Sequence, residues 1–94
     1  MLFRSAIMEG IVEATGLVAE LARVGSRIAV SDAGAAAVLL SAAVRAASLN
    51  VYINARSMAD RSCAEALTAR ADELVSQARR VADETFEQVE GGLR

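Results

Sequence analysis

The chain has 94 residues, of which 54% are hydrophobic and 3% aromatic, and its formal net charge is −2. This length allows a single domain, residues 1–94, with a modest core. The basic residues are all arginine and are interspersed with acidic ones, which argues against a nucleic-acid-binding surface. The chain has no histidine and one cysteine, Cys63. It therefore has no internal disulfide, is not expected to hold a zinc site or a His-dependent catalytic triad, and is predicted to be cytoplasmic.

The first predicted helix runs from about Ser5 to Val24. Its apolar residues recur every three or four positions, which is typical of a helix with one buried face. They are Ile7, Ile11, Ala14, Val18 and Leu21. Glu9 and Glu13 interrupt the apolar run that a secretory signal would need. Gly25 is predicted to follow the last helical residue as a C-terminal cap.

The second predicted helix follows a short link, residues 25–30, and should therefore return antiparallel to the first. Ser31 or Asp32 is predicted to cap it, and it extends to about Arg56. Its longest uncharged run reaches only from Ala33 to Val44, whereas about 20 apolar residues are needed to span a bilayer. We expect a helix buried on most of its sides in protein, with no membrane partner.

The third predicted helix begins after the segment "SMADRS", where Ser57 or Asp60 can cap it. One face is apolar and the opposite face is charged. The apolar stripe comprises Cys63, Leu67, Ala71, Leu74, Ala78, Val81 and Val89. Cys63 is thus predicted to be a small core residue, and Gly91-Gly92 to end the helix. The predicted fold is all-α: an antiparallel hairpin plus a long third amphipathic helix, packed as an oligomeric bundle.

Polar side chains in the second helix form two sets. Asn50 and Asn54 lie four residues apart, on one helical face. Arg45 and Arg56 lie on another face, roughly 16 Å apart along the axis. From residue chemistry alone, interhelical hydrogen bonds are favoured for the asparagines, and water or ion pairs for the arginines. Tyr52, the only tyrosine, needs a polar partner if it is buried.

The segment "GSRIAVSDAGAAAVLLSAAVRAASLNVYINARSMAD", followed by a long charged helix, resembles a known family. It is similar to the C-terminal half of the cyclodeaminase domain of the formiminotransferase-cyclodeaminase / methenyltetrahydrofolate cyclohydrolase family. Shared features are a glycine turn, a Ser-Asp pair heading an Ala-rich helix, and an Asn-rich end of that helix. They correspond to Gly25, Ser31, Asp32, Asn50, Val51, Ile53 and Asn54. The resemblance extends from about Ala6 to Val89.

The resemblance implies an all-helical, dimerising domain that acts on a tetrahydrofolate derivative without a bound metal or redox cofactor. The implied reaction is either a lyase step, in which the 5-formimino group closes onto N10 with loss of ammonia, or hydrolysis of the methenyl bridge. Asp32 is implied as the acid/base or pterin-binding carboxylate, although N-terminal capping alone is its favoured role from residue chemistry. Asn50 and Asn54 are implied as polar walls of the folate site, and Arg56 as a partner of the glutamate tail.

Family domains also contain an N-terminal half, with a helix pair rich in Gly and Ala, that helps to build the folate groove. This chain lacks such a segment, so we interpret it as a fragment or half-domain. It is expected to associate with itself through the faces that the other half would cover. The alternative function is a non-catalytic helical oligomerisation module, in which Asp32 only caps a helix and the asparagines only set the register.

Overall fold

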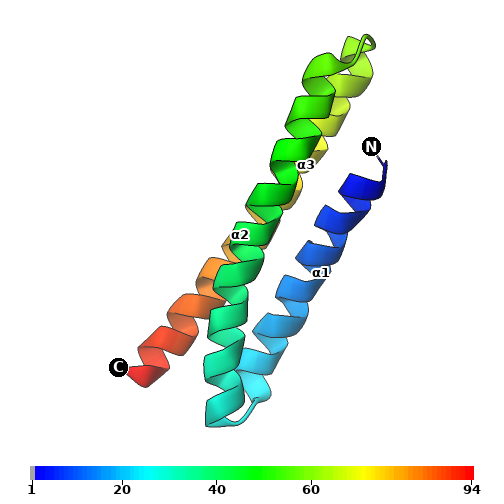
Figure 1. Ribbon diagram of the computed structural model, residues 1–94. Helices are drawn as coiled ribbons and strands as arrows, with labels where there is room; N and C mark the ends of the chain where they lie inside the picture. The colour runs from blue at the N-terminus through cyan, green and yellow to red at the C-terminus, as the bar shows by residue number, and fades with distance from the viewer. Residues whose placement is uncertain (1) are drawn as a thin grey trace.

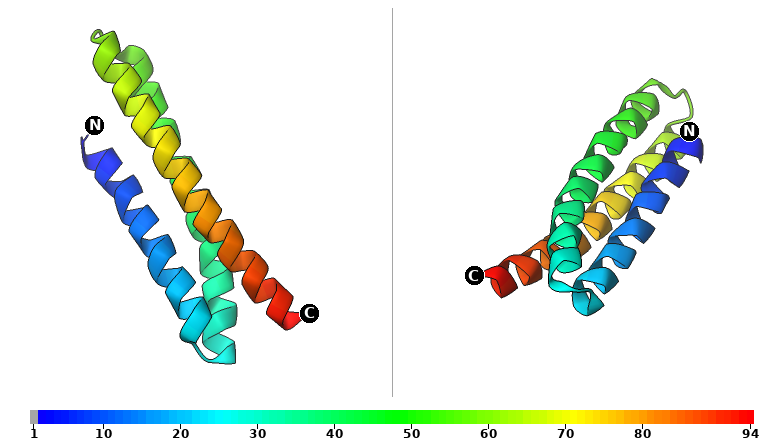
Figure 2. Two further views of the ribbon diagram at one scale, coloured as in Figure 1. Left: turned by 180° about the vertical axis from the view of Figure 1, so that it is seen from behind. Right: turned by 60° about the horizontal axis from the view of Figure 1, so that its bottom comes forward.

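The computed structural model describes the backbone of residues 2–94 and the side chains from Ala6 onward. It contains three helices, α1 (Leu2–Val24), α2 (Arg27–Ser57) and α3 (Arg61–Leu93). They alternate in direction and lie side by side in a rod of 51 × 20 × 14 Å (Figure 1). The shorter α1 does not reach the end of the rod where α2 turns into α3 (Figure 2). The predicted all-α hairpin with a long third helix is confirmed.

The helix α2 begins earlier than predicted. Ser26 has an extended backbone (φ −66°, ψ 166°), and its hydroxyl oxygen accepts a hydrogen bond from the backbone N–H of Ala29 at 3.3 Å. Ser26 is therefore the N-cap, and the prediction that Ser31 or Asp32 caps the helix was wrong. The reason is local: Ser26 is the first capping residue after α1, and nothing in residues 27–30 breaks a helix. Asp32 consequently lies inside the helix, in its second turn.

The structure also shows how the other residues that were predicted to cap or end a helix are used. Of the two predicted caps of α3, Ser57 and Asp60, the structure uses Asp60, whose carboxylate accepts from the N–H of Cys63 at 3.1 Å. Gly25 follows the last residue of α1, yet its φ is not positive; its N–H continues the helical pattern by donating to the carbonyl of Leu21 at 2.8 Å. Gly91 and Gly92 do not end α3, which continues to Leu93. Glycine permits a helix to stop but does not force it to.

The turn between α2 and α3 is held by a contact that the sequence did not suggest. The guanidinium of Arg61 donates from Nη1 to the carbonyl of Met58 at 2.7 Å and to that of Ala55 at 3.1 Å. These carbonyls lie at the C-terminal end of α2, where the number of intrahelical N–H donors falls; the carbonyl of Ala55 also accepts from the backbone N–H of Met58 at 3.2 Å. Arg61 thus stabilises the end of one helix from the first residue of the next.

The core is built mostly from alanine. From Ala6 onward, eight of the thirteen buried hydrophobic residues are alanines, and the main cluster adds larger side chains from every helix. These are Met8, Val44, Val51 and Leu74. A second cluster joins Ala22, Ala33 and Val89 near the turn between α1 and α2. Small side chains bring the helix axes close together, most clearly at Gly34, where an added Cβ would lie 2.8 Å from Cγ1 of Val89.

Two predicted core assignments were wrong in part. Among the described side chains of α1, Met8, Thr15 and Ala22 are buried, each one position after a member of the predicted stripe. Ile7 and Leu21 of that stripe are both 44% exposed, whereas Ile11 and Val18 pack against the core as predicted. Thr15 is buried at little cost because its hydroxyl donates to the carbonyl of Val12 at 2.6 Å. On α3, Cys63 is exposed and the neighbouring Ala64 takes the core position.

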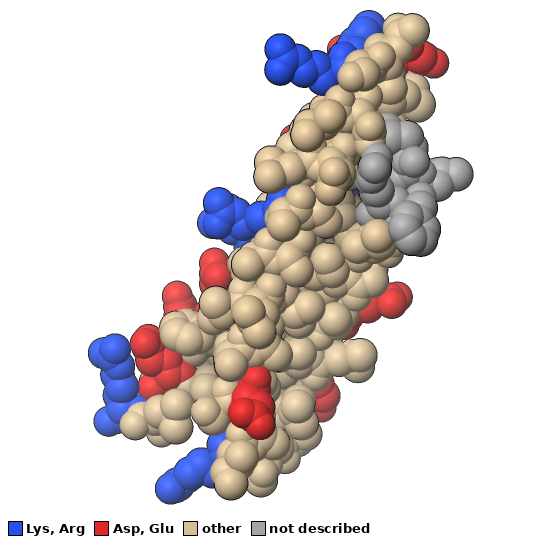
Figure 3. All heavy atoms as spheres, viewed as in Figure 1, with Lys and Arg blue, Asp and Glu red and all other residues tan. Residues whose placement is uncertain are grey.

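The prediction that α2 is buried on most of its sides was also wrong. Both α1 and α3 pack on one side of α2, so Leu39, Leu49 and Ile53 remain 61–69% exposed on the other. The surface over α2 is largely uncharged, with charged groups gathered at its edges and ends (Figure 3). By length and composition α2 is also long and apolar enough to cross a membrane, because an 18-residue window within it has a mean hydropathy of 1.6. A single such helix is weak evidence, since core helices of soluble proteins meet the same criterion.

Candidate functional site

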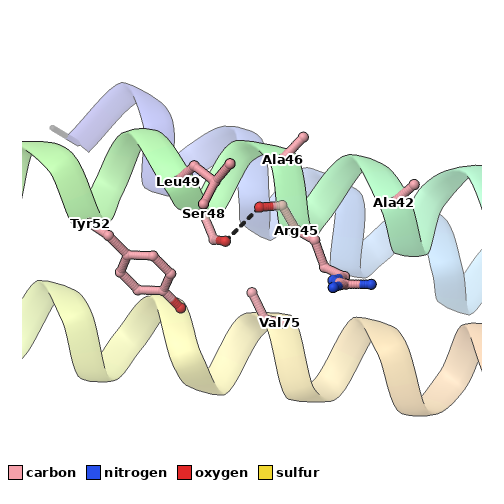
Figure 4. A pocket seen from close by; sticks show the side chains of 7 residues that line it. All are labelled: Ala42, Arg45, Ala46, Ser48, Leu49, Tyr52 and Val75. Carbon is pink, nitrogen blue, oxygen red and sulfur yellow. Dashed lines mark hydrogen bonds between the residues drawn. The ribbon is translucent and has the colours of Figure 1, made fainter.

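A groove of about 440 Å³ lies between the exposed side of α2 and the adjacent face of α3 (Figure 4). Its volume is within the range of small-molecule sites, although it is open to solvent. Seven residues line it: Ala42, Arg45, Ala46, Ser48, Leu49, Tyr52 and Val75. Its walls are mainly apolar. The guanidinium of Arg45 and the phenol of Tyr52 provide polar groups, and both side chains extend from α2 toward α3 (Figure 4).

The groove continues into a second hollow along α3. That hollow has a volume of about 300 Å³ and shares Tyr52 and Val75 with the first. Its other lining residues are Asp72, Ser76, Arg79 and Asp83. We call the two together the α2/α3 furrow. Since the far part is polar and the near part apolar, the furrow can hold a ligand that has an apolar body and polar substituents.

Tyr52 joins the two helices across the furrow. Its hydroxyl donates to Oδ1 of Asp72 at 2.5 Å, which is the polar partner that the sequence required. This hydrogen bond raises the pKa of the Tyr52 phenol above its ordinary value, with burial and the negative charge of Asp72 acting in the same direction. Ser48 acts weakly in the opposite direction. The phenol therefore stays protonated, and available as a donor, throughout the neutral range.

Titration of Tyr52 tests this contact directly, because the chain has one tyrosine and no tryptophan. Ultraviolet absorbance is expected to give a phenol pKa above that of free tyrosine, which is about 10. Asp72→Ala should lower it, whereas Asp83→Ala, in the same hollow but not bonded to Tyr52, should not. The stabilisation linked to this proton is complete below about pH 10 and is lost as pH rises through the folded-state pKa. An ordinary Tyr52 pKa in the wild-type protein would contradict the assignment.

The hydroxyl of Ser48 is already engaged. It donates to the carbonyl of Arg45, one helical turn back, at 2.6 Å (Figure 4). Activation of a serine nucleophile needs an adjacent base, and the groove residues include none. Among the described residues, no group of three or more acidic or cysteine side chains is placed to hold a metal ion. The furrow is therefore better suited to binding and orienting a ligand than to nucleophilic attack by the protein.

The site residues expected from the sequence lie on α2 outside the furrow. Asp32, Asn50 and Arg56 are exposed and Asn54 is half-buried, and none of the four lines either hollow of the furrow. Asn50 and Asn54 lie one turn apart, on one side of the helix. Asp32 is eighteen residues before Asn50, which corresponds to roughly 27 Å along a helix that rises 1.5 Å per residue. Within one copy of the chain, the carboxylate and the amides do not meet.

Sequence reasoning missed the furrow because two helices build it. Arg45 and Tyr52 are seven residues apart, and helical geometry therefore predicts that they lie on the same side of α2. The pairing of Tyr52 with Asp72 was not, because it depends on the axial register of α2 against α3. That register is set by contacts of Ala-rich faces, which look alike at several offsets.

The fold and the furrow define a small antiparallel three-helix domain with one open, ligand-sized groove between its second and third helices. Residues 4–73 match the family model of formiminotransferase-cyclodeaminase. This match covers nearly all of α1, the whole of α2 and the first part of α3, and the chain belongs to that family. The sequence-based family assignment is thereby confirmed. No curated protein and no solved structure matches the chain.

Proposed function

We propose that the chain binds a tetrahydrofolate derivative and takes part in cytoplasmic one-carbon chemistry, as a formimidoyltetrahydrofolate cyclodeaminase or methenyltetrahydrofolate cyclohydrolase. The observation that carries this proposal is the family match over residues 4–73. The matched range includes the Ser-Asp pair at residues 31–32 and both asparagines of α2. Tetrahydrofolate enters as a substrate, and the proposal assigns no bound cofactor.

The furrow supports this ligand class. A folate combines flat rings with a glutamate tail that carries carboxylates. Leu49 and Val75 supply apolar surface for a ring, and the Arg45 guanidinium matches a carboxylate in geometry and charge. Tyr52 offers an aromatic face beside them. The four residues expected from the sequence, Asp32, Asn50, Asn54 and Arg56, remain part of the proposal as groups that act on the one-carbon end or the tail.

The chemistry sets a further requirement. In the cyclodeaminase reaction N10 attacks the formimino carbon and a C–N10 bond forms. The proton of N10 and one further proton are transferred to the departing nitrogen, whose bond to carbon breaks so that it leaves as ammonia. In the cyclohydrolase reaction water adds to the methenyl carbon and one C–N bond opens. Both need a group that moves a proton, and Asp32 is the proposed one. A carboxyl in that role works in a partly desolvated site, whereas Asp32 of a single copy is exposed.

A second candidate function is a helical oligomerisation module without catalysis. The uncovered apolar side of α2 favours it, because contiguous exposed apolar surface of this kind marks interaction sites. The two functions are not exclusive, but they make different predictions about folate.

Isothermal titration calorimetry with 5,10-methenyltetrahydrofolate distinguishes between the two candidate functions. Saturable binding is expected, and Arg45→Ala should weaken it about tenfold, the loss of one charge-assisted contact. Arg23→Ala is the matched control, because Arg23 lies on α1 and pairs with Glu20. This variant should bind 5,10-methenyltetrahydrofolate with the same affinity as the wild type. A helical, folded sample that shows no saturable binding would contradict the folate proposal and leave the oligomerisation function.

A further inference from the structure

Two arginines line the α2/α3 furrow from opposite sides. Arg45 of α2 lines the near hollow, and Arg79 of α3 lines the far hollow. The side chain of Arg45 extends from α2 toward α3 (Figure 4). Both arginines are exposed, and neither takes part in the four ion pairs among the described side chains. The furrow therefore holds two positive charges that no contact among those side chains neutralises.

The axial register of α2 against α3 places these two arginines opposite each other. The hydroxyl of Tyr52 donates to Asp72 across the furrow. In an antiparallel pair, each step back along α2 matches one step forward along α3. Seven residues back from Tyr52 is Arg45, and seven residues forward from Asp72 is Arg79. Because seven residues make nearly two helical turns, both arginines also lie on the sides of their helices that face the furrow.

A second contact gives the same register independently. Gly34 of α2 lies against Val89 of α3, where an added Cβ would be 2.8 Å from Cγ1 of Val89. Arg45 is eleven residues after Gly34, and eleven residues before Val89 is Ala78, the neighbour of Arg79. Two contacts that lie roughly 27 Å apart along α2 thus agree to within one residue that Arg45 is level with Arg79.

The spacing of the helices allows the two guanidinium groups to approach one point. Helices packed side by side have axes about 8–10 Å apart, and arginine is long enough to extend across such a gap from either side. Arg45 and Arg79 can therefore converge on a single group between α2 and α3. Without such a group, two like charges face each other across the furrow, which is unfavourable.

The facing pair selects the charge of its ligand. A carboxylate has one negative charge, and a single guanidinium engages both of its oxygens. Two guanidinium groups on opposite helices require about two negative charges and acceptor oxygens that point to both sides. A phosphate group has about two negative charges at neutral pH and three strong acceptor oxygens. We infer that Arg45 and Arg79 together bind one phosphate group, either free phosphate or the phosphomonoester of a small molecule.

Two acidic residues share the far hollow with Arg79. Asp72 accepts the hydrogen bond from Tyr52, and it lies roughly 10 Å from Arg79 along the helix axis. Asp83 lies one turn beyond Arg79 and forms none of the four ion pairs. Asp83 is therefore expected to lower the affinity for an anion without neutralising Arg79, so its removal should improve binding.

The phosphate site goes beyond the proposed function. The family match ends at residue 73, so Arg79 and the wall of α3 around it lie outside the matched range. A tetrahydrofolate derivative contains no phosphate group, and phosphate is therefore a second ligand of the furrow. Because Arg45 is also proposed to contact a folate carboxylate, phosphate should weaken folate binding. This last step rests on the proposed function.

Thermal unfolding in sodium phosphate tests the site without folate. At constant ionic strength, the melting temperature of the wild type should rise over the millimolar range, because a ligand of the folded state stabilises it. Phosphate also stabilises proteins in general by exclusion from their surfaces, so the comparison of variants decides the test. Arg45→Gln and Arg79→Gln should each lower the phosphate affinity about tenfold, the loss of one charge-assisted contact. Arg80→Gln removes an exposed arginine that lines neither hollow and should keep the wild-type affinity.

An NMR titration distinguishes one shared site from two independent ones. The Nε–H signals of Arg45 and Arg79 should shift along a single binding curve, and either single variant should abolish the common shift at the same phosphate concentration. Asp83→Asn should strengthen phosphate binding about twofold, the weight of one solvent-exposed charge contact. Both arginines are exposed, so neither replacement should unfold the protein, and far-ultraviolet circular dichroism checks that the helices are retained.

Other results would overturn the inference. Phosphate that leaves both Nε–H signals unchanged contradicts it, and so does an Arg79→Gln protein with the wild-type affinity. Binding of p-aminobenzoylglutamate through both arginines, without binding of phosphate, would assign the pair to the carboxylates of a ligand tail instead. Phosphate binding by a protein that does not bind 5,10-methenyltetrahydrofolate contradicts the proposed function while leaving the phosphate site intact.

Discussion

Replacing Leu74 by alanine is expected to lower the free energy of unfolding by about 2–4 kcal/mol. Leu74 is 2% exposed and packs with Met8 and Val44 in the main core cluster. Its neighbours on α3, Ala71 and Ala78, are too small to fill the space that the missing atoms would leave. Because a domain of this size has only about 5–15 kcal/mol of stability in total, the variant should unfold at a clearly lower urea concentration, measured by far-ultraviolet circular dichroism.

The matched control is Leu17→Ala, since Leu17 is 73% exposed on α1. The same chemical change there should alter stability by no more than about 0.5 kcal/mol. Both variants should be compared at one protein concentration, because association stabilises the folded state. Equal losses in the two variants would mean that Leu74 is not part of a packed core.

Elements that depend on local chemistry could be predicted from the sequence. Three helices, the antiparallel return of the second helix and a cap of the third helix at Ser57 or Asp60 all follow from periodicity, short links and side chains that bond to their own backbone. The exception among local features is the start of α2. There Ser26 and Asp32 are both competent caps, and the nearer one to the end of α1 is used because it leaves fewer backbone groups without partners.

Features that depend on which face of a helix is covered could not be predicted. Both α1 and α2 carry apolar residues on several sides. Hydrophobicity alone therefore does not show that Met8 rather than Ile7, or Val44 rather than Leu39, is buried. The choice is made by the shape of the neighbouring helices: Met8 and Val44 are completely buried, whereas Leu39 is 69% exposed. A chain whose apolar pattern exceeds the needs of its own core has surface left for a partner.

The candidate site shows the same difference between what a sequence pattern indicates and what helix packing determines. The sequence pointed to Asp32 and to the two asparagines through family resemblance, and these residues lie on α2 outside the furrow rather than in a shared cavity. The furrow, in contrast, is defined by Tyr52 and Asp72, whose contact depends on the register of two helices. Family resemblance thus identified residue types, while the packing of α2 on α3 determines where one copy of the chain can hold a ligand.

Gly34→Ala is expected to destabilise the protein, although alanine is the better helix former. At an open helical position, replacing glycine by alanine raises the free energy of unfolding by about 1 kcal/mol. Gly16→Ala should show that increase, because nothing lies within 4 Å of the Cβ it would add. At Gly34 the added Cβ would lie 2.8 Å from Cγ1 and 3.1 Å from Cβ of Val89. The side chain of Val89 is branched at Cβ and has little rotamer freedom in a helix.

Relief of that contact requires α2 and α3 to move apart, which opens the neighbouring cluster of Ala22, Ala33 and Val89. We expect a net loss of about 1–3 kcal/mol, opposite in sign to the change at Gly16, in chemical unfolding curves of the two variants. Adding Val89→Ala to Gly34→Ala should recover part of the loss, so that the two changes are not additive. A gain in stability at Gly34 equal to that at Gly16 would show that α2 and α3 do not approach closely there. The Ala-rich contact would then not determine the register that aligns Tyr52 with Asp72.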